Sequence, residues 1–99
     1  LALEIDAPCF FLRRSGELQV FRYPDAGAAW VTIAAGRTAG EATRKAWNLP
    51  GDEVCGEQTR GIFMKDGALR VSGSVRSGGI YCRDKGVDEK EFWSVAHGR

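Results

Sequence analysis

Several residue types that often carry chemistry are scarce in this chain. Its 99 residues include one histidine, one methionine, three prolines and three cysteines. The single imidazole, His97, stands near the end of the chain, where chains fray, so a serine or cysteine nucleophile lacks an obvious base. We therefore do not expect an enzyme, and nothing in the composition calls for a metal or other cofactor.

Two further absences bear on where the protein acts. No apolar run is long enough to cross a bilayer, so we expect no membrane-spanning segment. The formal net charge is only +1, which argues against strong, salt-dependent binding of nucleic acid. The chain starts at Leu1 rather than methionine, which is typical of a processed protein and is compatible with a removed targeting segment.

The three cysteines are too far apart for a Cys-x-x-Cys redox pair or for a common local zinc pattern. One disulfide with one spare thiol fits their number better. We favour Cys55–Cys82, because Cys82 ends a Ser/Gly-rich stretch and Cys55 follows a turn; Cys9–Cys82 is the second choice. A bridge would indicate an oxidising compartment, either the periplasm or the exterior, whereas three reduced thiols would indicate the cytosol.

Most of the chain has the pattern of β-strands. Short runs of β-branched and aromatic residues alternate with turn signals, and Asp66-Gly67 between two apolar runs is a strong hairpin signal. The predicted strands cover residues 9–14, 17–23, 29–34, 59–65, 68–72, 79–83 and 91–96. We therefore predict a single α+β domain, residues 1–99: a mostly antiparallel β-sheet or small β-barrel of about seven strands with one inserted helix.

The inserted helix is predicted for residues 38–49. Thr38-Ala-Gly-Glu41 has the form of a capping box, in which the Thr hydroxyl serves the Glu amide and the Glu side chain reaches back. Small apolar residues then recur at helical spacing, and Asn48 and Pro50 indicate the end of the helix. We expect Trp47 to pack against its neighbours.

The stretch Val71–Cys82 has the composition of a recognition loop. Its serine hydroxyls both donate and accept hydrogen bonds, its glycines allow close approach, and its arginine is a planar cation that pairs with carboxylates. A flexible connector between two strands is the alternative interpretation. The candidate partner-binding residues are Ser74, Arg76, Ser77, Gly78, Gly79 and Tyr81.

Part of this stretch resembles a known family. Ser77-Gly-Gly-Ile-Tyr81 is similar to the Ser-Gly-x-x-Tyr signature of bacterial periplasmic and membrane-bound inhibitors of c-type lysozyme, and Phe92-Trp-Ser94 is similar to the element that follows it. Two features depart from the family: Val95-Ala96 stands where it has Lys-Gly, and no cysteine follows Cys82. The resemblance implies a small antiparallel β-barrel whose signature loop enters the lysozyme cleft and blocks its catalytic carboxylates.

These features together predict a secreted or periplasmic inhibitor. It would insert residues 72–81 into the active site of a peptidoglycan-cleaving, lysozyme-like enzyme. One alternative is an immunity protein that neutralises a secreted antibacterial toxin, such as a cell-wall amidase. A small nucleic-acid-binding module and a toxin domain are further alternatives.

Overall fold

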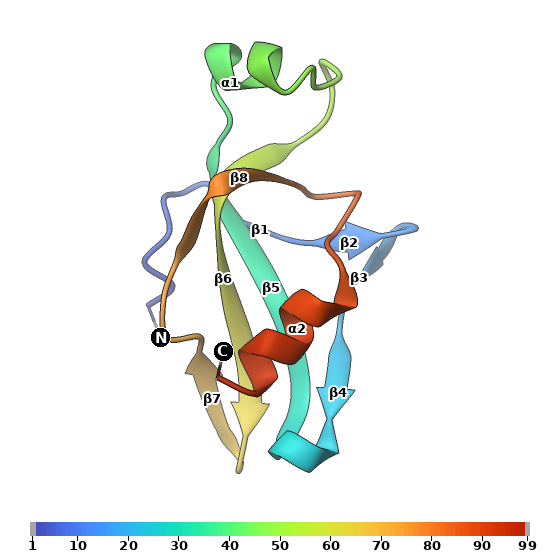
Figure 1. Ribbon diagram of the computed structural model, residues 1–99, viewed down its shortest axis with the longest axis vertical. Coiled ribbons are helices and arrows are strands. Elements are labelled where there is room, and N and C mark those ends of the chain that lie inside the picture. Colours follow the sequence, from blue (N-terminus) through green and yellow to red (C-terminus); the bar gives the residue numbers. More distant parts are fainter. Residues whose placement is uncertain (1, 99) are drawn as a thin grey trace.

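The computed structural model of the protein describes residues 2–98. Its centre is a pair of long antiparallel strands, β5 (Ala28–Thr38) and β6 (Cys55–Lys65), which run side by side over 11 residues each (Figure 1). The run of apolar and β-branched residues in the middle of β5 favours an extended, buried strand. The predicted strands 29–34 and 59–65 are therefore confirmed, and both extend further than the sequence pattern indicated.

Shorter strands flank this pair. On the β5 side lie β1 (Phe10–Phe11) and β4 (Phe21–Tyr23), and on the β6 side lie β7 (Ala68–Val71) and β8 (Arg76–Cys82). A separate small hairpin joins β2 (Arg13–Arg14) to β3 (Glu17–Leu18).

The mostly antiparallel β architecture is confirmed, since every strand pair in the structure is antiparallel. Within residues 2–98 the two sides of the sheet do not pair with each other. The sheet is therefore open, and the barrel form of the prediction is not confirmed.

Residues 2–98 form two α-helices, not one. The first, α1 (Glu41–Ala46), lies on an arm between β5 and β6 that extends away from the sheet (Figure 1). The predicted capping box is wrong, because Thr38 is still part of β5, opposite Gly56, and the helix is capped by Gly40 without a side-chain hydrogen bond. Trp47 does not pack as expected, since it is 52% exposed.

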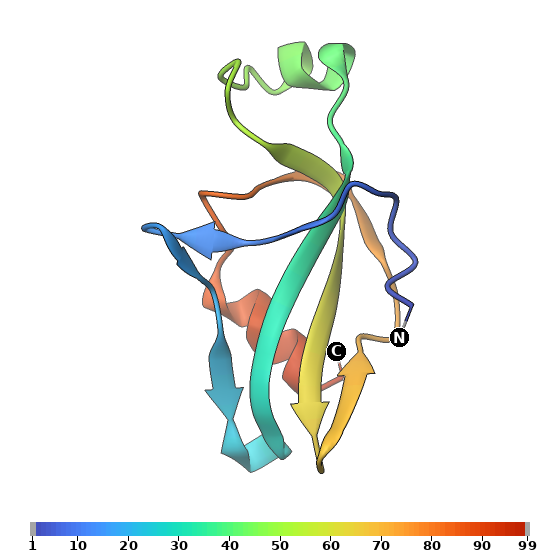
Figure 2. The same cartoon turned by 180° about the vertical axis from the view of Figure 1, so that it is seen from behind.

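The second helix, α2 (Glu89–Ala96), replaces the predicted last strand, residues 91–96, so that prediction was wrong. The Asp88 side chain accepts a hydrogen bond from the Lys90 amide and caps the helix. Phe92 and Ala96, four residues apart, are both buried, which is a helical spacing. The helix crosses one face of the sheet, and no helix from the described part of the chain covers the opposite face (Figures 1 and 2).

Among residues 2–98, two apolar clusters stabilise the fold. In the main one, Phe92 of α2 packs against Phe21, with ring centroids 4.6 Å apart, and against residues of β5. The smaller one surrounds the disulfide Cys55–Cys82, which joins directly opposite positions of β6 and β8 at the base of the α1 arm. The predicted pairing is thus confirmed, and Cys9 is a free, exposed thiol. No helix among residues 2–98 is long and apolar enough to cross a membrane.

Candidate functional site

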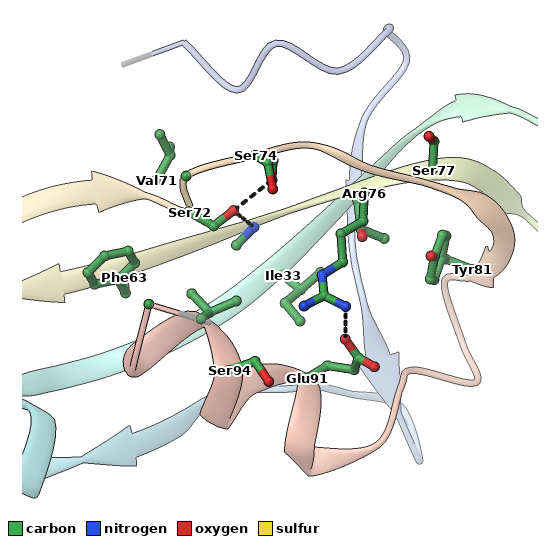
Figure 3. Close-up of a pocket in the computed structure, with 15 residues that line it drawn as sticks. Ile33, Phe63, Val71, Ser72, Ser74, Arg76, Ser77, Tyr81, Glu91 and Ser94 are labelled. Carbon is green, nitrogen blue, oxygen red and sulfur yellow. Dashed lines mark hydrogen bonds and ion pairs between the residues drawn. The ribbon is translucent and has the colours of Figure 1, made fainter.

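A groove of about 600 Å³ lies between α2 and the edge of the sheet formed by β7 and β8 (Figure 3). Its floor comes from β5 and β6, one wall from α2, and the other wall from the turn and strand after β7. The residues that line it include Ile33, Thr59, Gly61, Phe63, Ser72, Arg76, Tyr81, Glu91, Ser94 and Val95.

Gly61 sets how closely the helix approaches the sheet. A Cβ atom at this position would stand 2.4 and 2.5 Å from the two Cγ atoms of Val95, closer than side chains can approach. The missing side chain therefore lets α2 rest on β6 at this point. The groove opens beside this contact, towards β8.

An ion pair crosses the groove. The Arg76 guanidinium of β8 lies 3.3 Å from the Glu91 carboxylate of α2, as Figure 3 shows. The two side chains are 52% and 32% exposed. Because a pair this exposed contributes at most about 1 kcal/mol, either partner can exchange it for a group on a ligand at small cost.

The turn between β7 and β8 is fixed by Ser72. Its hydroxyl accepts a hydrogen bond from the Gly61 amide at 3.0 Å and donates one to the Ser74 carbonyl at 3.3 Å. The buried Arg60 side chain also donates to the Ser72 carbonyl, at 2.7 and 2.9 Å. The hydroxyl and the carbonyl of Ser72 are thus both engaged in hydrogen bonds within the protein, and these bonds hold the turn in one conformation.

The predicted projecting loop is smaller than expected. Residues 76–82 form β8, which pairs with β6, so only residues 72–75 are a loop. The sequence suggested a loop because Gly78 and Gly79 are poor strand formers. Gly78 has a φ of +90° at an irregularity in the pairing, a conformation that favours glycine. In the sequence, the glycines of this bulge in an edge strand were therefore interpreted as the end of the strand.

The candidate residues differ in how far they are exposed and in which way their side chains point. Ser74, Arg76, Ser77 and Gly78 are exposed, while Gly79 and Tyr81 are half-buried. Ser74, Arg76, Ser77 and Tyr81 all line the groove, although Figure 3 shows the Ser77 side chain turned away from α2. Neighbouring residues of a strand point to opposite faces, so Arg76 and Ser77 must diverge.

Sequence reasoning missed the residues that α2 and β6 contribute. Glu91 and Ser94 were hidden because their segment was predicted as a strand, and a helix was needed to place both beside β8. Thr59 carries no sequence signal as a site residue. It lies opposite Arg76 on β6, so only the strand pairing brings the two together.

A second polar cluster holds the end of α2. The two ring nitrogens of His97 lie 2.8 Å from the Trp93 carbonyl and 2.9 Å from the Asp25 carboxylate. The hydrogen bond with His97 lowers the pKa of Asp25, although loss of hydration opposes it. Burial, followed by the hydrogen bond to Glu89, raises the pKa of Tyr23. This cluster ties the helix to the 3-10 turn η1 (Pro24–Ala26).

Glu53 and the disulfide sulfurs also lie together, with their ligand atoms within 4.8 Å of one another. Because both sulfurs are bonded to each other, neither is a thiolate, and the group does not form a metal site. Glu53 instead pairs with Lys85 at 3.5 Å.

No family model matches the chain, and no curated protein or solved structure matches it either.

Proposed function

We propose that the protein is a secreted or periplasmic inhibitor that binds a peptidoglycan-cleaving, lysozyme-like enzyme through residues 72–81. The observation that carries this proposal is the exposed row Ser74, Arg76, Ser77 and Gly78, which ends at the disulfide-bonded Cys82. A disulfide is compatible with the periplasm or the exterior. The binding element is then a rigid ridge at the edge of the sheet and the turn before it.

The rigidity of this ridge favours binding. Ser72 fixes its start through hydrogen bonds, β6 pairs with its middle, and the disulfide fixes its end. A segment that is already ordered loses little conformational entropy when a partner docks on it. The short side chains of Ser77 and Gly78 also leave the backbone open to close approach.

Arg76 is the residue expected to reach the target's catalytic groups. Glycoside-cleaving enzymes use pairs of carboxylates, and a guanidinium can bind a carboxylate through two parallel hydrogen bonds. In the unbound protein Arg76 pairs with Glu91 across the groove. A carboxylate of the enzyme would take the place of Glu91, at the small cost of a half-exposed ion pair.

Lysozyme inhibition tests the proposal. The wild-type protein is expected to inhibit c-type lysozyme, and Arg76→Ala to raise the inhibition constant about 10-fold to 100-fold, as for a lost hydrogen bond to a charged group. The matched control is Arg22→Ala, which removes another exposed arginine, on β4, away from the ridge. If the wild type inhibits none of several types of lysozyme, the proposal is wrong.

A second candidate function is an immunity protein against a secreted antibacterial toxin such as a cell-wall amidase. The α1 arm favours it, because the arm extends from the sheet and exposes Trp47, a residue type enriched among energetically dominant contacts. Co-purification with the toxin tests this function. Loss of the complex with Trp47→Ala, together with absence of lysozyme inhibition by the wild type, would support the immunity role over the first proposal.

A further inference from the structure

The Thr59 side chain in the floor of the groove carries a hydroxyl group that makes no hydrogen bond to the described part of the protein. Thr59 lines the groove and is only 5% exposed. No hydrogen bond among residues 2–98 involves its hydroxyl, and this oxygen is not one of the fully buried polar atoms left without a partner, so it keeps some contact with the groove. The position of Thr59 therefore leaves its hydroxyl to water or to a ligand that enters the groove.

The polar groups around Thr59 offer both donors and acceptors. Arg76, directly opposite Thr59 on β8, donates, and Glu91 on the facing helix accepts. The Ser94 hydroxyl donates to the Lys90 carbonyl at 2.9 Å, which leaves its lone pairs able to accept. Because the charges of Arg76 and Glu91 cancel, this part of the groove favours a neutral ligand rich in hydroxyl and amide groups.

Apolar surface lies directly beside these groups. Thr59, Gly61 and Phe63 follow each other at every second position of β6 and therefore face α2 together, with Ile33 opposite Gly61. Phe63 and Tyr81 stand at opposite ends of the groove in Figure 3. Apolar and aromatic walls with a few placed polar groups are typical of small-ligand sites, as is the groove's volume.

The groove continues beyond Phe63. A second hollow of about 480 Å³ shares Phe63 and Gly98 with the first and is lined further on by Lys65, Asp66 and Arg70. A ligand that fills both is longer than a single sugar or amino acid.

From these features we infer that the groove binds a neutral glycan segment that carries N-acetyl groups. An acetamido group has one donor, one acceptor and a methyl, which match the Thr59 hydroxyl and the apolar surface of Ile33 and Phe63 beside it. Arg76 and Glu91 would bind neighbouring sugar hydroxyls from the two walls. This inference does not depend on the proposed inhibition, although both use Arg76.

Calorimetric titration with a soluble trimer of N-acetylglucosamine tests the inference. We expect saturable binding to the wild type and a dissociation constant about 5-fold to 10-fold larger for Thr59→Val, which removes the hydroxyl but keeps the shape. Thr43→Val, the same change on α1 away from the groove, should bind like the wild type. Glu91→Gln, at a partly exposed position, should weaken binding about 10-fold or more.

Four results would overturn the inference. The first is no binding at millimolar trimer, and the second is wild-type affinity in both Thr59→Val and Glu91→Gln. The third is equally tight binding of a glucose trimer without acetamido groups, and the fourth is tighter binding of a neutral extended peptide. Thr59→Val also separates the two ideas, because Thr59 lies in the buried floor of the groove and not on the exposed ridge. That variant should weaken glycan binding and keep enzyme inhibition, so either activity can fail while the other stands.

Discussion

The contact between Gly61 and Val95 makes a sharp prediction for Gly61→Ala. The new methyl would stand 2.4 and 2.5 Å from the Val95 Cγ atoms, and because valine is branched at Cβ, it cannot swing both methyls aside. Helix α2 must then move away from β6. Overpacking of this kind costs about 1–3 kcal/mol, which outweighs the better strand propensity of alanine.

A double-mutant cycle isolates this contact. Val95→Ala alone removes half-buried methyl groups and should cost about 1 kcal/mol. It also removes the atoms that a methyl introduced at position 61 would meet, so Gly61→Ala should cost about 1–2 kcal/mol less in that background. The matched control is Gly73→Ala, where a Cβ meets no atom within 4 Å and the change should be neutral or stabilising by up to about 1 kcal/mol.

Urea and thermal unfolding followed by circular dichroism measure these effects. Each kcal/mol should lower the unfolding temperature by about 4–8 °C in a domain of this size. If Gly61→Ala is as stable as the wild type, or costs the same with and without Val95, helix α2 does not rest on β6 as described.

Three further outcomes are expected. Replacing Cys55 and Cys82 by serine should lower the free energy of unfolding by about 3–4 kcal/mol for a bridge spanning 27 positions, seen as a lower urea midpoint; an unchanged midpoint would contradict it. The lowered pKa of Asp25, due to its hydrogen bond with His97, stabilises the fold above about pH 4, and this is lost as the pH falls through the folded pKa. Asp25→Asn should therefore flatten the acid part of a plot of unfolding temperature against pH, and an unchanged slope would exclude the pair. Gly40→Asp, which has open space and a capping conformation at α1, should raise stability by about 0.5–1 kcal/mol in the same urea assay, whereas a loss would show that Gly40 does not cap the helix.

Function is best resolved by measuring the two binding activities on the same variants. Arg76→Ala is expected to weaken both enzyme inhibition and glycan binding, since its guanidinium lies on the ridge and at the groove. Thr59→Val should affect only glycan binding. A protein that inhibits no lysozyme but binds the glycan would be a glycan-binding module. A protein that inhibits lysozyme but does not bind the glycan would act as an inhibitor only.

Local patterns were enough to predict the central strands and the Asp66-Gly67 turn, and they favoured the Cys55–Cys82 disulfide over its alternatives. The residues of β5 are β-branched or small and apolar over a long run, a pattern that excludes a solvent-exposed helix. The Ser/Gly-rich stretch also drew attention to the edge of the sheet that borders the groove. Strands and turns depend on neighbours in the chain, so the sequence by itself contains them.

Tertiary structure decided the rest. The segment after Asp88 can be read as a strand or a helix, because Phe92, Val95 and Ala96 are too few to fix a period; packing of Phe92 on Phe21 selects the helix. Likewise, the stretch after Val71 became a strand because β6 offered it a partner. The groove exists only where that strand, that helix and the bare Gly61 meet, since its walls come from segments far apart in the chain.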